Sequence, residues 1–183
     1  MAQRSTVYKA ELQIADMDRG HYATHALTIA RHPSETEERL MVRLLAFALN
    51  ADEALAFGRG LSSDDEPDLW LRDLTGAIRL WIEVGLPDEK WIRKACGRAE
   101  RVLVVAYGGS KADIWWNQNA GALARLDNLS VMRIDAETGA ALAGLAQRSM
   151  QLSCNVQDGQ AWIGSDSQGV TCEPAWLKAP SRS

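Results

Sequence analysis

A helix between two apolar segments is the feature that most limits how this chain can fold. Residues 77–84 are predicted to form a strand, Pro87 begins a helix that runs to about Ala99, and the continuous apolar run Val102–Ala106 follows. Proline is favoured in the first turn of a helix, where its missing N–H would have no partner. Continuous apolar runs are typical of strands buried on both faces, as in parallel sheets. Residues 77–106 therefore predict one βαβ unit with a right-handed crossover, and hence an α/β protein.

The N-terminal segment alternates polar and apolar residues in the manner of a β-hairpin. Residues 7–14 form one alternating run, residues 18–20 supply a turn, and residues 22–30 return as a second strand. His21 and His25 would share one face of this second strand, where strand rise separates them by about 13 Å. That distance is too long for a common metal, so we interpret both histidines as structural or surface residues.

Two capping-box patterns mark the starts of helices. Ser34 with Glu37 forms the first pattern, and Ser110 with Asp113 forms the second. In each, a hydroxyl and a carboxylate are spaced to accept backbone donors at the helix start. The first helix is expected to end near Asn50, and apolar residues recur through it at helical spacing: Leu40, Met41, Leu44, Leu45 and Ala48.

The C-terminal third predicts a strand, a helix and a hairpin, in the order 129–134, 136–147 and 150–163. Asp158-Gly159 is a strong signal for the type I′ turn that closes tight hairpins. The tail from about residue 174 is expected to be loosely held, because chain ends are poorly ordered unless another element fixes them. We therefore expect a single α/β domain, residues 1–183, in which helices flank a mixed sheet and hairpins extend both ends of the chain.

Composition narrows the classes of function. The 183-residue chain has a net charge of −4, so any contact with nucleic acid needs a local basic patch or a bound cation. No apolar run approaches the ~20 residues that cross a bilayer, and the N-terminus lacks the apolar region of a signal peptide. Three scattered cysteines, Cys96, Cys154 and Cys172, predict free thiols without a disulfide, in a reducing compartment such as the cytoplasm.

The segment 68–84 folds into a hairpin with two distinct faces when Thr75-Gly76 is taken as a two-residue turn. One face is apolar and pairs Leu71 with Leu80 and Leu69 with Ile82. The opposite face pairs Arg72 with Arg79, Trp70 with Trp81, and Asp68 with Glu83. Side chains directly opposite in a strand pair lie about 4.5–5.5 Å apart, and like charges there are destabilising. The carboxylate pair therefore needs an explanation.

A divalent cation is one explanation for these adjacent carboxylates. Mg²⁺ is typically held by one or two carboxylates together with water and phosphate oxygens, and Mn²⁺ accepts the same ligand types. Such an ion polarises a phosphate and generates a hydroxide nucleophile. The alternative is that the strand ends splay, so that Asp68 and Glu83 both point into water. The pairing alone leaves both interpretations open.

The order of these motifs resembles the PD-(D/E)XK nuclease-like superfamily, whose core is a helix, three strands, a helix and a strand. Pro67-Asp68, the hairpin, and Glu83-Val84-Gly85 in a βαβ unit after a leading helix carry this resemblance. Longer strings resemble the YaeQ family over nearly the whole chain: HPSETEER, DDEPDLW, WIEVGLPDEKWIRKACGRAERV and MQLSCNVQDGQ. The resemblance implies a restriction-endonuclease-like fold in a bacterial protein family, and it supplies no substrate.

Two residues match the acidic positions of the superfamily. Asp68 matches its metal-binding aspartate and Glu83 its second acidic position, so the resemblance implies that both bind Mg²⁺ or Mn²⁺ and act in catalysis. Gly85 stands where the E-x-K pattern has a lysine, and this departure places cleavage in question. Lys90 is the candidate replacement, because helical side chains lean toward the N-terminus and so toward the strand end. The alternative for Lys90 is an ordinary solvated lysine.

A helix glutamate often joins such sites in the superfamily. Glu38 is the preferred third metal ligand, because Glu37 is already the capping-box partner, and the alternative for Glu38 is a surface position. Arg72 and Arg79 are candidates for phosphate contacts beside the carboxylates, and they are equally interpreted as solvent-facing arginines.

Two functions follow from these patterns. The first is a Mg²⁺-dependent phosphodiesterase that acts on DNA or RNA through Asp68, Glu83 and Lys90. The second is a catalytically inactive nuclease-fold protein that serves as a nucleic-acid-binding or regulatory module. The carboxylate pair favours the first function, whereas Gly85 and the net charge of −4 favour the second. The position of Lys90 relative to the two carboxylates distinguishes them.

Overall fold

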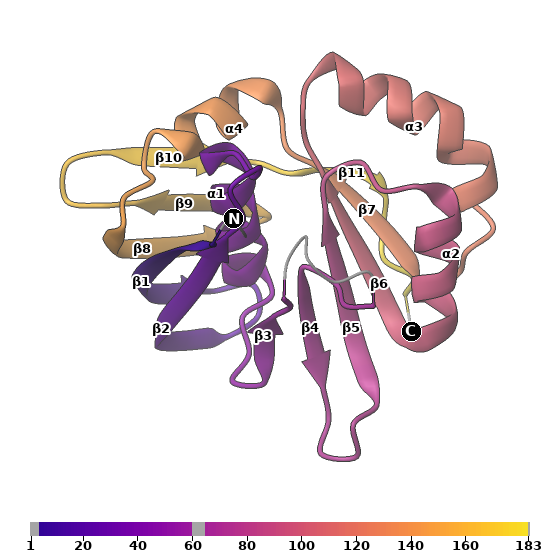
Figure 1. Cartoon of the computed structure of the whole chain (residues 1–183), viewed down its shortest axis with the longest axis horizontal. Helices are drawn as coiled ribbons and strands as arrows, with labels where there is room; N and C mark the ends of the chain where they lie inside the picture. Colours follow the sequence, from indigo (N-terminus) through magenta and orange to yellow (C-terminus); the bar gives the residue numbers. More distant parts are fainter. Residues whose placement is uncertain (1–3, 60–64, 183) are drawn as a thin grey trace.

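The computed structural model describes residues 4–59 and 65–182, and within these ranges the chain forms four helices and eleven strands. The strands are arranged in two mixed sheets (Figure 1). The protein is therefore mixed α/β, as the sequence predicts. The additional hairpins expected near the two ends of the chain pair with each other and form a second sheet of their own.

This first sheet has the strand order β10-β9-β8-β1-β2. Its strands are β1 (Thr6–Asp16), β2 (His21–Arg31), β8 (Ser149–Gln157), β9 (Gln160–Gly164) and β10 (Gly169–Cys172). β1 pairs antiparallel with β2 and parallel with β8, so the N-terminal hairpin lies beside the hairpin β8–β9 from the last third of the chain. Both predicted hairpins are confirmed, and Asp158 and Gly159 both have positive φ, as a type I′ turn requires.

The second sheet has the strand order β11-β7-β6-β5-β4-β3. Its strands are β3 (Leu55–Phe57), β4 (Leu69–Arg72), β5 (Ile78–Val84), β6 (Ala99–Ala106), β7 (Leu129–Arg133) and β11 (Ala175–Lys178). β5, β6 and β7 run parallel, and the helices α2 (Glu89–Arg98) and α3 (Ser110–Leu123) connect them and cover one face. The predicted βαβ unit is therefore confirmed.

Helix α1 (Glu37–Leu49) is the centre of the protein. Its residues from Leu40 to Ala48 are all buried, including Arg43. A helix buried on every side lies inside a core and not on a surface. One buried cluster joins α1 to α4 (Ala136–Ala143), to the inner face of the first sheet, and to the face of the second sheet opposite α2 and α3.

The hairpin β4–β5 has the predicted register over most of its length. Leu69 pairs with Ile82, Trp70 with Trp81, and Leu71 with Leu80. The predicted pairing of Arg72 with Arg79 is wrong, because a bulge after Leu71 pairs Arg72 with Ile78. The turn is longer than two residues, since the Asp73 carboxylate accepts hydrogen bonds from the backbone of Thr75 and Ala77.

Both predicted helix caps are shifted. Thr36, and not Ser34, caps α1 by accepting a hydrogen bond from the Arg39 amide, while the Ser34 hydroxyl contacts His32. α3 begins directly at Ser110 after Gly109, without a side-chain cap. Ser and Thr hydroxyls reach several nearby amides, so sequence spacing alone does not fix which of them caps a helix.

The C-terminal tail is held by the second sheet, which corrects the expectation of a loose tail. β11 pairs antiparallel with β7 at the sheet edge. The Lys178 ammonium donates to the Leu129 carbonyl at 3.0 Å, and the Ser181 hydroxyl donates to the Asp127 carbonyl at 2.5 Å. Without β11, β7 would be the edge strand of the sheet, with unpaired backbone groups. The four residues of β11 are too few for a periodic pattern to predict a strand from the sequence.

His21 and His25 contact each other, which the strand rise did not predict. Their Nε2 atoms lie 2.9 Å apart and their rings stack with centroids 5.2 Å apart. Ala23, the residue between them on the same face, carries only a methyl group, so the two imidazoles lean along the strand and meet over it. The His25 ring also packs edge-on against Phe47 of α1.

This contact predicts a low pKa for His25. Burial lowers the pKa of His25 below its ordinary value of 6.5, and the charge of His21 lowers it further, against the opposing charges of Glu53 and Asp52. In an NMR titration, His25 should therefore gain its proton below pH 6.5, and His21→Gln should raise that pKa part of the way back. A His25 that titrates at or above the ordinary value would contradict the observed pairing.

The three cysteines are free, as predicted. Burial raises the pKa of the Cys96 thiol to about 11 and those of Cys154 and Cys172 to about 12.

Across residues 4–59 and 65–182, no helix has both the length and the apolar character needed to cross a bilayer.

Candidate functional site

Asp68 and Glu83 meet where β4 begins and β5 ends. The register that pairs Leu69 with Ile82 places Asp68 opposite Glu83, and the Asp68 amide donates to the Ile82 carbonyl at 3.1 Å. Both side chains are buried, with exposed fractions of 5% and 9%. The splayed, solvated alternative is therefore wrong, and the two carboxylates occupy one buried acidic centre.

The Asp68 carboxylate is fully engaged by the protein itself. Its Oδ1 accepts a hydrogen bond from Arg39 Nη2 at 2.7 Å, in a salt bridge with α1. Its Oδ2 accepts the backbone amide of Val84 at 2.7 Å. Arg39 also donates to the Val84 carbonyl at 3.2 Å, so one arginine ties the helix to the ends of both strands.

Arg39 belongs to a chain of buried charges that crosses the N-terminal half of α1. Glu35 accepts a hydrogen bond from Arg39 through Oε2 at 2.5 Å and from Arg43 through Oε1 at 2.7 Å. Arg43 also donates to the Ala30 carbonyl of β2 at 2.9 Å. Two arginines thus face two carboxylates, and the network Asp68–Arg39–Glu35–Arg43 carries no net charge.

Glu83 is held by two tryptophans. Its Oε1 accepts hydrogen bonds from Trp81 Nε1 at 2.8 Å and from Trp91 Nε1 at 2.7 Å. Burial raises the pKa of Glu83 to about 7, the charge of Asp68 raises it further, and the two indole hydrogen bonds and Arg39 act in the opposite direction. Glu83 therefore titrates near neutral pH, unlike an exposed glutamate.

The other predicted site residues do not join the two carboxylates. Lys90 is exposed at the start of α2, and within the described chain no hydrogen bond or ion pair links it to Asp68 or Glu83. Glu38 leans against α4, since a methyl group added at Gly139 would come within 2.4 Å of its Oε1. The charged group beside Asp68 is Arg39, a residue that the sequence analysis did not select.

A signal for Arg39 was nevertheless present in the sequence. Glu35, Arg39 and Arg43 follow one another at intervals of four residues, the spacing at which oppositely charged side chains pair along a helix. Arg43 also interrupts the apolar stripe of α1. A charge at such a position is rarely buried unless it has a partner, so the pair of arginines predicts buried carboxylates nearby.

The donor set does not fit a Mg²⁺ or Mn²⁺ site. Mg²⁺ requires near-octahedral coordination by oxygen ligands, and Mn²⁺ accepts the same ligand types. Here Asp68 and Glu83 already accept four hydrogen bonds from the protein, and one of these comes from the positively charged Arg39 guanidinium. Within residues 4–59 and 65–182, no group of three or more His, Cys, Asp or Glu side chains is arranged to hold a metal. The Arg39 guanidinium supplies the positive charge that a cation would bring.

A surface of tryptophans and cations lies beside this acidic centre. We call it the tryptophan–cation surface, and it consists of Trp70, Arg72, Trp91, Lys94 and Arg98. The Arg72 guanidinium lies 4.1 Å from the Trp70 ring centre, and the Lys94 ammonium lies 5.4 Å from that of Trp91. The Arg98 guanidinium covers Trp81 at 5.0 Å. Trp70 and Trp91 are half-buried, whereas the three cations are exposed.

Arg79, the other arginine predicted to touch phosphate, lies elsewhere. It is exposed and forms salt bridges with Asp73 at 3.0 Å and Glu100 at 2.7 Å. Within the described ranges, Arg72 has no carboxylate partner, so it is the better placed of the two for an outside anion.

The fold and this site define a mixed α/β protein whose buried acidic centre is closed by an arginine. The chain belongs to the YaeQ family, because the family model described as YaeQ protein matches residues 1–174. The uncharacterized protein YaeQ of Escherichia coli (strain K12) is 45% identical over 181 residues, which cover 99% of this chain and 100% of that protein. The protein of the same description from Salmonella typhi is 46% identical with the same coverage.

Two solved structures share the fold over nearly the full length. The crystal structure of the YaeQ protein from Xanthomonas axonopodis pv. citri is 54% identical and has a TM-score of 0.93, over 96% of this chain and 99% of that chain. The YaeQ protein from Pseudomonas syringae is 39% identical and has a TM-score of 0.92, over 97% of this chain and 98% of that chain. The resemblance to the YaeQ family is thereby confirmed.

Proposed function

We propose that this protein is a nucleic-acid-binding module built on a nuclease-like core, in which an arginine has replaced the catalytic metal. The salt bridge between Arg39 and Asp68, at 2.7 Å, carries this proposal. It neutralises the aspartate that a metal-dependent nuclease needs as a ligand, and it does so with a group that cannot generate a hydroxide nucleophile.

The order of elements supports the nuclease-like part of the proposal. α1 is followed by β3, β4 and β5, then by α2 and β6, which is the sequence of a helix, three strands, a helix and a strand. Asp68 lies at the start of the second strand and Glu83 near the end of the third, as the PD-(D/E)XK resemblance implies. We infer that the core is of this kind and that the first sheet is an addition to it.

Two further features favour binding over cleavage. Gly85 occupies the usual lysine position, and its φ of +119° favours glycine, so a lysine there would be strained. Lys90 is exposed and makes no polar contact with the carboxylates in the described part of the chain. The lysine of the E-x-K pattern, which stabilises charge on a cleaved phosphate, is therefore absent from the acidic centre.

The tryptophan–cation surface supports nucleic acid as the partner. Proteins that bind single strands combine a basic surface with aromatic side chains on which bases stack, and each stacked base contributes about 1–3 kcal/mol. Trp70 and Trp91 are accessible aromatic rings, and Arg72 and Arg98 supply exposed positive charge close to them. Lys94 adds a third exposed cation, which lies 3.9 Å from an Asp65 carboxylate oxygen. This local patch is what a chain with a net charge of −4 requires for contact with phosphate.

Equilibrium binding of labelled single-stranded DNA and RNA, measured by fluorescence anisotropy in EDTA at low salt, tests this function. We expect binding without metal, and we expect Trp70→Ala to raise the Kd about tenfold, since loss of one stacked base is worth about 1–3 kcal/mol. Arg72→Ala should weaken binding and reduce its salt dependence, because one phosphate contact is lost.

Two matched controls separate this surface from general effects. Trp176 and Arg125 are exposed, and Trp176 lies on β11 at the opposite edge of the second sheet. Trp176→Ala and Arg125→Ala should leave the Kd unchanged. Absence of binding at low salt, or equal weakening by the control variants, would rule out the tryptophan–cation surface as a nucleic-acid site.

The raised pKa of Glu83 supports a second candidate function, that of a Mg²⁺-dependent phosphodiesterase. The charge of Asp68 contributes to this pKa of about 7, and a cation would relieve that repulsion. This candidate requires cleavage of DNA or RNA in Mg²⁺ or Mn²⁺, abolished by Asp68→Asn and by Lys90→Ala. Binding without cleavage in either metal favours the binding module.

A further inference from the structure

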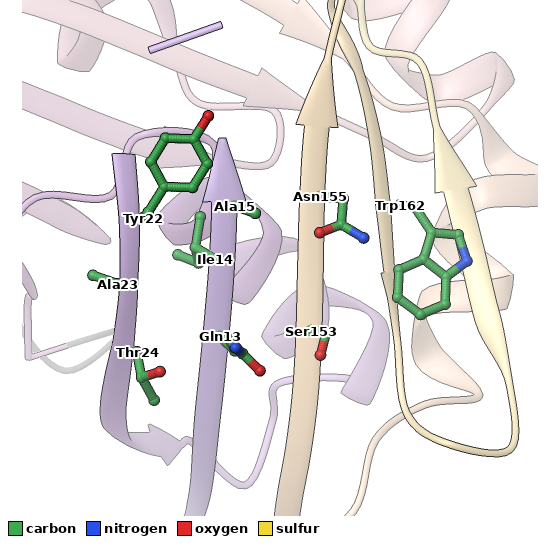
Figure 2. A pocket seen from close by; sticks show the side chains of 9 residues that line it. All are labelled: Gln13, Ile14, Ala15, Tyr22, Ala23, Thr24, Ser153, Asn155 and Trp162. Atoms are coloured by element: carbon green, nitrogen blue, oxygen red, sulfur yellow. The ribbon is translucent and has the colours of Figure 1, made fainter. Parts of the chain in front are cut away.

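The outer face of the first sheet carries a hollow of about 600 Å³ that the proposed function does not use (Figure 2). α1 and α4 pack on the opposite face of this sheet, so the hollow opens away from the core. Its side chains come from β2, β1, β8 and β9, and include Gln13, Tyr22, Thr24, Ser153, Asn155 and Trp162. The site is thus built from four neighbouring strands of one sheet.

Strand register arranges these side chains in two parallel rows. The first row crosses the sheet through Tyr22, Ala15, Asn155 and Trp162. The second row crosses through Thr24, Gln13, Ser153 and Gly164. Aromatic rings therefore stand at both ends of the first row, with the small Ala15 between them as a floor and amides and hydroxyls beside it.

The Trp162 indole lies against the sheet as a preformed platform. A methyl group added at Gly169 would come within 2.4 Å of the indole Nε1, and one added at Gly164 within 2.8 Å of Cζ2. Two glycines on neighbouring strands thus reserve the space into which the ring packs. Trp162 remains 37% exposed, so part of the ring is open to a ligand.

The lining of the hollow favours a neutral ligand over a phosphate. Neither row contains an ionisable group other than the Tyr22 phenol. The adjoining turns carry Asp18 and Asp158, and the Asp18 carboxylate accepts hydrogen bonds from the Asp158 and Gly159 amides. Arg19, the cation in the same turn as Asp18, pairs with Asp16 at 3.7 Å. The hollow thus offers an anion no cationic side chain among its lining residues, whereas a neutral ligand needs none.

We propose that this hollow binds a neutral oligosaccharide. The side chains of Gln13, Ser153 and Asn155 each offer donors and acceptors together, which is what pairs with sugar hydroxyls. Trp162 offers a flat apolar surface on which the carbon–hydrogen face of a pyranose ring packs. Three strand spacings separate Tyr22 from Trp162, or about 14 Å, so the row accommodates more than one sugar ring.

A neutral trisaccharide panel tests the proposal with the full-length protein. Maltotriose, cellotriose and triacetylchitotriose are titrated by isothermal titration calorimetry, with the dinucleotide UpU as the charged comparison. We expect at least one trisaccharide to bind and UpU not to compete for the site. Trp162→Ala should weaken that binding about tenfold or more, the equivalent of a lost apolar contact of about 1.4 kcal/mol.

Two milder variants keep the test decisive if Trp162→Ala fails to fold. Asn155→Ala should weaken binding about two- to tenfold, because it removes one net hydrogen bond at an exposed position. Gly169→Ala should also weaken it, because its methyl displaces the indole. Trp176→Ala, an exposed tryptophan of the other sheet, should have no effect. Failure of all three trisaccharides to bind, binding that Asn155→Ala and Gly169→Ala leave unchanged, or preference for UpU would overturn the proposal.

Discussion

Arg39→Ala is expected to lower the free energy of unfolding by about 3–5 kcal/mol, because it leaves buried carboxylates without their partner. Arg39 is only 14% exposed, and it bonds to Asp68 and to Glu35 at once. For a protein of this size the loss corresponds to a fall in melting temperature on the order of 10 °C. Thermal and urea unfolding monitored by circular dichroism measure it directly.

Arg79→Ala is the matched control for this variant. Arg79 also pairs with two carboxylates, Asp73 and Glu100, but its side chain is 52% exposed and water screens the interaction. Its loss should change the melting temperature little. Equal melting temperatures for the Arg39 and Arg79 variants would mean that the buried network does not hold α1 against the β4–β5 hairpin.

Wild-type protein is expected to lose stability as the pH rises from about 4.5 to about 7, relative to Glu83→Gln. The pKa of Glu83 is about 7 in the folded protein, against an ordinary value of 4.5. In this window the folded state holds a proton that the unfolded state has released, so stability falls as the pH rises. The contribution of protonated Glu83 to the free energy of unfolding is thus fully present below pH 4.5 and is lost above pH 7.

The size of this effect follows from the same two values. A rise from 4.5 to about 7 corresponds to about 3 kcal/mol, which makes Glu83→Gln the more stable protein at pH 8 by an amount of that order. Glutamine retains an oxygen that accepts both indole N–H groups. Unfolding free energies of both proteins at pH 5 and pH 8 measure the difference. A difference that stays constant between these two pH values would mean that Glu83 is ionised throughout.

The parts of the fold that sequence predicted are those fixed by local pattern. The apolar run of β6 and the helix before it predict the βαβ unit, because few ways of connecting two neighbouring strands are compatible with both features. The segregated faces of the β4–β5 hairpin gave its register, because a shift of one residue would bury the wrong face. The pairing of the terminal hairpins into one sheet depends on contacts between distant residues, which no local pattern contains.

The acidic centre was predicted only in part for the same reason. The register placed Asp68 beside Glu83 correctly, because both residues belong to one hairpin. Arg39 comes from α1, and its arrival at Asp68 depends on how that helix packs into the core. The His21–His25 contact could not be predicted for a different reason. Strand rise gives the distance between the two backbone positions, whereas the two imidazole side chains lean toward each other over Ala23.

The two candidate binding sites differ in their chemistry. The tryptophan–cation surface on the second sheet combines aromatic rings with arginine and lysine side chains, whereas the hollow on the first sheet is lined by neutral side chains. Variants at Trp70 and at Trp162 should therefore affect different ligands. Loss of both binding activities in one variant would indicate unfolding and not loss of a site.

The melting temperature of the wild-type protein, in EDTA and in millimolar Mg²⁺ or Mn²⁺, shows whether Arg39 has taken the place of a metal ion at Asp68. A cation that binds the folded state at a hundredfold excess over its Kd adds about 2.7 kcal/mol of stability, which a thermal melt easily detects. Because Arg39 already neutralises Asp68, we predict no metal-dependent change. A rise of several degrees that Asp68→Asn abolishes would contradict the claim and restore the metal-dependent nuclease.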